Sequence, residues 1–158
     1  MKIFTKKSLL VLTQMSAFLL TSCGGKSVLK SYSKKLGVDL DKGEIIHYED
    51  NHGGFLGDGF MLCISKYGND DIENQISESD KFHKYPLSEN LHTFIYDPFD
   101  SNLEIPEFEN GYYYFKNRHS NATDDLTDSE LFGTVSFNFS FVLYDCNADL
   151  AYICDYDT

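Results

Sequence analysis

The residue types best suited to acid–base chemistry occur together in a glycine-rich stretch, residues 52–59, which reads His-Gly-Gly-Phe-Leu-Gly-Asp-Gly. An imidazole held by a carboxylate can transfer a proton or bind a metal ion, so His52 and Asp58 are candidate catalytic residues. Glycines allow positive φ angles and the close approach of a ligand. The same glycines are also typical of a tight β-hairpin turn that serves geometry alone. The stretch is neither a P-loop nor a dinucleotide turn, because no Gly-Lys-Ser/Thr and no helix pattern follow it.

A tyrosine-rich stretch, residues 112–119, carries the only arginine of the chain. On a β-strand, Tyr112, Tyr114 and Arg118 share one face. Arg118 beside His119 at a strand end can clamp a carboxylate or a phosphate, and the tyrosine rings can stack on a sugar or a peptide. In the alternative interpretation the arginine pairs with an acid of the following loop, and the tyrosines pack in the core.

Two classes of function remain open. The first is a non-enzymatic domain that binds a protein, a peptide or an envelope ligand. The second is a small hydrolase or metal-dependent enzyme built on His47, His52, Asp58, Arg118 and His119. The chain lacks the Gly-x-Ser-x-Gly, His-Glu-x-x-His, EF-hand and Cys/His zinc patterns, which favours the binding domain. We accordingly expect no metal site, and an acidic stretch at 121–130 is better explained as a solvated loop than as a calcium site.

The N-terminal 22 residues have the composition of a signal peptide. Three lysines and no acidic residue accompany an apolar stretch from Leu9 to Leu20, which is too short to span a bilayer. The string Leu20-Thr21-Ser22-Cys23 then resembles the lipobox of bacterial lipoprotein precursors. The resemblance implies a diacylglyceryl group on the thiol of Cys23 and cleavage just before it. It further implies a protein anchored through Cys23 in the lipid bilayer, at the extracytoplasmic face of the bacterial cell membrane, with no cofactor besides that lipid.

Charge is distributed unevenly along the chain. The formal net charge is −12, and five basic residues stand against 23 acidic ones from Gly43 to Thr158. Nucleic acid is excluded as a partner, because phosphate binding needs a basic patch. Four lysines between residues 26 and 35 can either contact anionic headgroups or form a solvated helix face.

Three cysteines follow the lipobox, namely Cys63, Cys146 and Cys154. An odd number allows one internal disulfide at most. We favour three reduced thiols that pack as small hydrophobic side chains.

Apolar periodicity predicts the elements that position these residues. Leu29, Tyr32 and Leu36, followed by Gly37, predict a helix over 26–36. A period of two predicts strands at 45–48, 60–67, 93–96, 112–116, 134–144 and 150–156, and residues 69–79 have weak helical character. The fold class expected is α+β, a single domain with a mostly antiparallel sheet of five or six strands and one or two short helices. The expected organisation is a cleaved signal peptide at 1–22, a lipidated cysteine with a Lys-rich tether or helix at 23–42, and an acidic α+β domain at 43–158.

Three strings, His52–Gly59, Gly111–His119 and Ser136–Phe139 before Tyr144-Asp145, are similar to strings of small uncharacterised lipoproteins of Gram-positive bacteria. This resemblance covers most of the mature chain. It implies an exported, anchored protein and brings no activity, ligand or catalytic residue with it.

Overall fold

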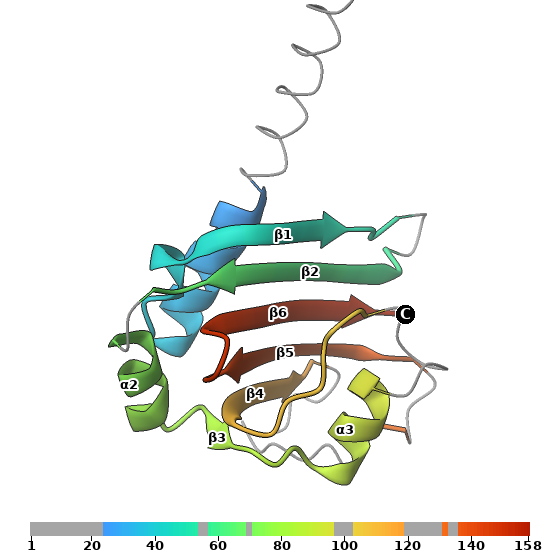
Figure 1. Cartoon of the computed structure of the whole chain (residues 1–158). Helices are drawn as coiled ribbons and strands as arrows, with labels where there is room; N and C mark the ends of the chain where they lie inside the picture. The colour runs from blue at the N-terminus through green and yellow to red at the C-terminus, as the bar shows by residue number, and fades with distance from the viewer. Residues whose placement is uncertain (1–23, 54–56, 69–70, 97–102, 119–130, 133–135) are drawn as a thin grey trace, which may run out of the picture.

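Six strands form one antiparallel sheet in the computed structural model, which describes residues 24–53, 57–68, 71–96, 103–118, 131–132 and 136–158. Their order across the sheet is β1-β2-β6-β5-β4-β3 (Figure 1). The strands are β1 (Glu44–Asp50), β2 (Gly59–Lys66), β3 (His83–Lys84), β4 (Gly111–Asn117), β5 (Asn138–Asp145) and β6 (Leu150–Asp157). The helices in these ranges are one over residues 24–36, α2 (Asp71–Glu78), α3 (Glu89–Tyr96) and the short 3-10 helix η1 (Leu40–Lys42). The predicted α+β fold with an antiparallel sheet is confirmed, with three α-helices where one or two were expected.

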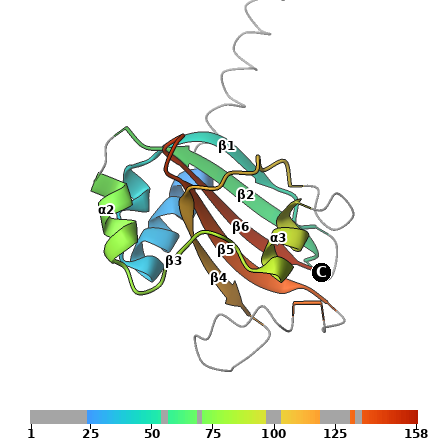
Figure 2. The same cartoon turned by 60° about the horizontal axis from the view of Figure 1, so that its bottom comes forward.

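Different elements cover the two faces of the sheet (Figures 1 and 2). The helix over residues 24–36 and α2 pack on one face, which we call the two-helix face. Helix α3 packs on the other, the α3 face, together with residues 103–108. Strand β5 is buried on both faces, because Phe139, Phe141 and Leu143 lie in the α3-face core while Val142 and Tyr144 lie in the two-helix core. Such double burial explains the uninterrupted apolar run from Phe141 to Tyr144.

The helix over residues 24–36 is part of the core. Leu29, Tyr32 and Leu36 are at most 5% exposed and pack with sheet residues of the two-helix face. The helix ends at Gly37, which has a φ of 73° and donates its N–H to the Ser33 carbonyl. The predicted helix over 26–36 is therefore confirmed, and the helical conformation includes residues 24 and 25 as well.

Residues 93–96 form the end of α3, so the strand predicted there is wrong. The run Thr-Phe-Ile-Tyr is rich in strand-forming residues, but Leu91, Phe94 and Ile95 have helical spacing and are all buried against the sheet. The Ser88 side chain accepts a hydrogen bond from the Leu91 N–H and caps the helix. Packing and capping together outweigh the local strand preference.

The β5–β6 hairpin confirms the strongest sequence prediction. Its turn is held by the Asp145 carboxylate, which accepts hydrogen bonds from two backbone N–H groups of the turn. Asp149 takes the positive φ of 54° that the turn requires. Strand β5 begins at Asn138, four residues later than expected, and residues 134 and 135 of that prediction lie outside the described part of the chain.

Candidate functional site

Four charged side chains meet at one end of the two-helix face, and we call them the ion cluster: Asp50, His52, Arg118 and Asp157. His52 Nδ1 lies 2.7 Å from an Asp50 oxygen, and its Nε2 lies 3.1 Å from Asp157 Oδ2. The other oxygen of Asp157 accepts a hydrogen bond of 2.8 Å from Arg118. The structure thus brings together His52 and Arg118, two of the candidate residues named from the sequence, and Asp157 joins them.

A glycine in β2 makes this meeting possible. Asp157 is opposite Gly59 in the β2–β6 pair, and the chain that leaves β1 passes directly over Gly59. A Cβ atom there would come within 2.8 Å of the His52 Cα and the Asn51 carbonyl oxygen. Because that space is free, His52 reaches from the β1 side across β2 to the end of β6. On the other side, Arg118 follows β4 and is aligned by a 2.7 Å bond from its N–H to the Asn138 carbonyl.

The contacts of His52 determine what its imidazole can do. Both ring nitrogens lie within hydrogen-bond distance of carboxylate oxygens, Nδ1 beside Asp50 and Nε2 beside Asp157. A general base needs a ring nitrogen that can reach the substrate, and both nitrogens of His52 are engaged by carboxylates of the cluster. Burial alone would raise the pKa of the Asp50 carboxyl, but hydrogen bonds from the His52 side chain and backbone outweigh it and hold that pKa below its usual value. The ion cluster therefore has a structural geometry: it links the ends of β1, β4 and β6 through hydrogen bonds between charged groups and His52.

A second polar group lies beside the cluster on the same face. The Tyr32 hydroxyl donates to Asp155 Oδ1 at 2.6 Å, and the Ser140 hydroxyl donates to the same oxygen at 2.5 Å. Burial, and then the nearby Asp155 charge, raise the pKa of Tyr32 far above its usual value. The serine thus faces a carboxylate and not an imidazole, and these bonds tie the first helix to the sheet.

The remaining predicted site residues are not gathered at this point. Asp58 has an exposed side chain and closes the turn by accepting the Gly53 N–H on its carbonyl. His119 and the acidic stretch at 121–130 lie outside the described residues. Arg118 forms an ion pair with Asp157, close to the C-terminus. The acids of the following loop, which the sequence offered as its partners, lie outside the described residues.

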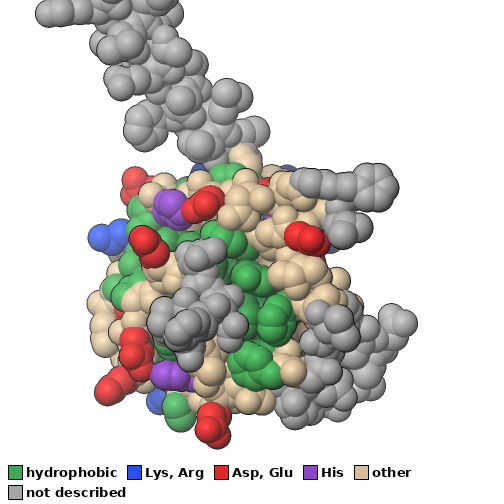
Figure 3. All heavy atoms as spheres, turned by 90° about the vertical axis from the view of Figure 1, so that its right-hand side faces the viewer, with side chains coloured by type: hydrophobic (Ala, Val, Ile, Leu, Met, Phe, Trp, Pro, Cys, Tyr) green, Lys and Arg blue, Asp and Glu red, His purple; other side chains and the backbone are tan. Residues whose placement is uncertain are grey.

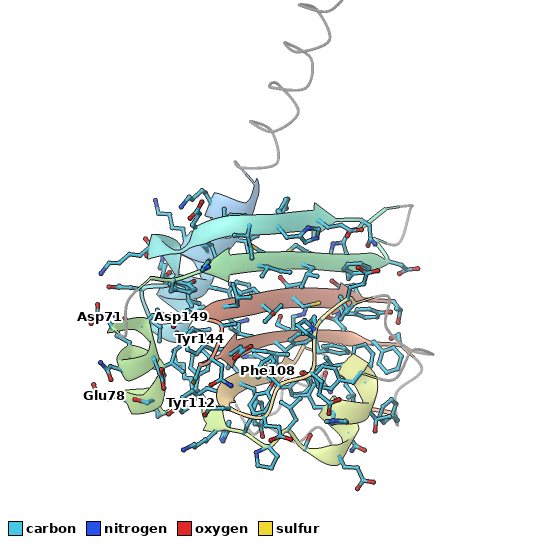
Figure 4. All side chains as sticks on the ribbon, viewed as in Figure 1. Asp71, Glu78, Phe108, Tyr112, Tyr144 and Asp149 are labelled. Carbon is cyan, nitrogen blue, oxygen red and sulfur yellow. The ribbon has the colours of Figure 1, made fainter. Side chains whose placement is uncertain are left out.

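The two tyrosines predicted to bind a ligand lie along β4. Tyr114 is 8% exposed and packs in the two-helix core against Phe82, with the Lys35 ammonium over its ring. Tyr112 is partly buried at the end of the sheet near α2 (Figure 4). Six residues of extended chain, about 20 Å, separate it from Arg118. The structure therefore does not join these tyrosines and Arg118 into one small site.

The α3 face carries an open groove at its β1–β2 end, with a cavity volume of about 580 Å³. We call it the β1–β2 groove. Its lining residues are His47 and Glu49 from β1, Asn51 just after β1, Phe60, Leu62 and Ile64 from β2, and Glu104 from the segment that crosses the face. Figure 3 shows hydrophobic side chains reaching the surface among carboxylates at the adjoining end of the molecule. The volume is that of a typical small-ligand site.

Strand register explains the composition of the groove. His47 is opposite Ile64, and Glu49 is opposite Leu62, so a polar row from β1 runs beside an apolar row from β2. A β-bulge between Ile45 and His47 sets this phase, because one extra residue exchanges the faces to which later side chains point. The His47 imidazole lies 3.8 Å from the Glu49 carboxylate.

Sequence reasoning did not identify Glu49, Glu104 or Asp157 as site residues. Two of them could have been found from strand alternation, because residues two positions apart share a face of a strand: Glu49 follows His47 by two positions, and Asp157 follows Asp155 by two. Glu104 has no such signal, because a loop segment brings it to the groove.

Three cysteines of the described chain, Cys63, Cys146 and Cys154, are free thiols, as predicted. Cys63 and Cys154 are buried, whereas Cys146 is partly exposed. Burial raises the pKa of Cys63 to about 11, and burial together with the neighbouring Glu73 raises that of Cys146 to about 12. At neutral pH these thiols are protonated and poorly nucleophilic.

Within the described ranges, no cluster of three or more histidine, cysteine, aspartate or glutamate side chains has a geometry that could hold a metal ion. The helices in those ranges are also too short or too polar to cross a membrane. Comparison with protein-family models, with curated proteins and with solved structures finds no match to this chain.

Proposed function

We propose that this protein is a lipid-anchored, non-enzymatic binding domain at the extracytoplasmic face of a bacterial cell membrane, with its ligand in the β1–β2 groove. The groove is the observation that carries the binding part of the proposal. It combines an apolar floor with a few polar groups, as ligand sites commonly do. The lipobox ending at Cys23 supports the anchor.

The contacts of the candidate catalytic residues favour binding over catalysis. Both ring nitrogens of His52 face carboxylates, and the Ser140 hydroxyl faces Asp155. A nucleophile hydrogen-bonded to a free base, as hydrolases need, is not formed by these described groups. The alternative of a small hydrolase or metal-dependent enzyme therefore gains no support from the ion cluster.

Acyl labelling tests the anchor. Cells that express the wild-type chain and are fed a palmitate analogue should yield a labelled, membrane-bound protein. Cys23→Ala should lose the label and accumulate uncleaved precursor, whereas Cys146→Ala should keep both label and processing. Unchanged labelling of Cys23→Ala would overturn the anchor.

A ligand array tests the groove. We expect the wild-type chain to bind at least one member of an array of peptides and envelope fragments. His47→Trp, which places a large ring in the groove, should abolish that binding without changing the far-ultraviolet circular dichroism spectrum. Binding that survives His47→Trp but is lost in Arg118→Ala would move the site to the ion cluster and contradict the proposal.

A further inference from the structure

The β1–β2 groove has a spacing that matches an extended polypeptide. Successive lining residues of one strand are two positions apart, so each row repeats every 7 Å or so, which is also the spacing between side chains on one face of an extended peptide. The floor is apolar, since Phe60 and Leu62 are nearly buried at 7% and 4% exposure. An extended peptide can therefore place successive apolar side chains on this floor.

The charges at the groove are acidic on both sides. Glu49 stands on the β1 side with about half of its side chain exposed. Glu104 comes from the segment that crosses the α3 face, lines the same groove and is exposed as well. The chain as a whole carries a net charge of −12. An anionic ligand would be repelled here, whereas a cationic side chain would find a carboxylate on either side.

We infer that the β1–β2 groove binds a basic, apolar peptide segment in extended conformation. This inference rests on the proposed binding function and names the class of its ligand. Apolar side chains of the segment lie on Phe60 and Leu62, and lysine or arginine side chains reach Glu49 and Glu104 at the rim. The aliphatic part of a lysine or arginine can cover the floor as well, which suits these residues to a rim of this kind.

The experiment uses the full chain in nonionic detergent, with detergent alone as the blank. The probe is the peptide acetyl-Lys-Leu-Lys-Leu-Trp-amide, and the protein has no tryptophan, so tryptophan fluorescence reports on the peptide alone. We expect saturable binding of this probe and at least tenfold weaker binding of its analogue with glutamate for lysine. Binding should weaken as salt is added, because exposed charge pairs are screened.

Matched variants separate the groove from general charge attraction. The double variant Glu49→Gln/Glu104→Gln should weaken probe binding about tenfold, the sum of two exposed ion pairs. Glu78→Gln removes the same kind of charge from α2, on the far side of the molecule (Figure 4), and should change binding less than about twofold. An equal loss in Glu78→Gln, or equal binding of the glutamate analogue, would overturn the inference.

Failure here is distinguishable from failure of the proposed function. If the probe does not bind while the ligand array finds a sugar or another ligand that His47→Trp abolishes, the peptide inference is wrong and the binding domain stands. If Cys23→Ala keeps its acyl label while the probe binds as expected, only the anchor is wrong.

Discussion

Replacing Gly57 by alanine is expected to lower the free energy of unfolding by about 1 kcal/mol, because Gly57 has a φ of 76°. A left-handed conformation costs an L-residue roughly 1–2 kcal/mol, and the smaller entropy of the unfolded alanine chain offsets part of that cost. A Cβ atom at Gly57 would meet nothing within 4 Å, so no steric clash adds to the backbone strain. Gly53, in the same turn, has no positive φ, and its Cβ would make ordinary contact at 3.7 Å. Gly53→Ala should therefore stay within about 0.5 kcal/mol of wild type.

Gly59→Ala should be the most destabilising of the three glycine-to-alanine variants. Its φ of 145° is nearly restricted to glycine, and the added Cβ would lie 2.8 Å from backbone atoms of residues 51 and 52. We expect a loss of more than about 2 kcal/mol, together with displacement of His52 from Asp157. Urea unfolding followed by far-ultraviolet circular dichroism measures all three variants. Equal stability of the Gly53 and Gly57 variants, or a Gly59 variant as stable as wild type, would refute this account of the turn.

Three further changes test other parts of the structure. Leu29→Ala should lower the unfolding free energy by about 2–5 kcal/mol, because Leu29 is fully buried; a loss below about 1 kcal/mol would mean that its helix is not part of the core. Asp50→Asn should be less stable than wild type at neutral pH, and the difference in unfolding free energy should vanish on acidification. The pKa of the Asp50 carboxyl is lowered in the folded state, so its ionised form stabilises the fold above the unfolded pKa of about 3.9. This stabilisation is lost as the pH falls through the folded pKa. A pH-independent difference in urea titrations would contradict the bond to His52. Iodoacetamide should label Cys146 before Cys63, because Cys63 is buried. Labelling of Cys146 should be slow at pH 7 and about tenfold faster for each added pH unit, as long as the pH stays below the pKa of the thiol. Mass spectrometry of digests that finds Cys63 labelled first would contradict the assigned burial.

Strands were predictable where burial alternates or is continuous. Val142 and Leu143 are neighbours that pack on opposite faces, and the sequence around them shows that pattern directly. Helix α3 was not predictable in this way, because Phe94 and Ile95 favour a strand by themselves and form a helix only through the tertiary core and the Ser88 cap.

The candidate site divides along similar lines. His52 and Arg118 could be singled out in the sequence as candidate site residues, and the structure places both of them on the Asp157 carboxylate. Their partner Asp157 comes from another strand, and strand order is a long-range property that local patterns do not contain. Glu104 reaches the groove through the path of a loop, which periodicity does not describe.

The packing of Gly24 and Gly25 against β1 determines how far from a membrane the protein could bind a ligand. Gly24 and Gly25 lie so close to Tyr48 and Ile45 of β1 that an added Cβ would overlap those side chains, so the residue that follows Cys23 in the sequence is already packed against the sheet. A flexible leash of 20 residues would let a domain wander about 25 Å from its attachment point. If Cys23 carries the lipid, the packed residue Gly24 directly follows the attachment point, and β1 lies close to the headgroups. The protein would then bind only ligands that approach the bilayer surface to within about the diameter of the domain.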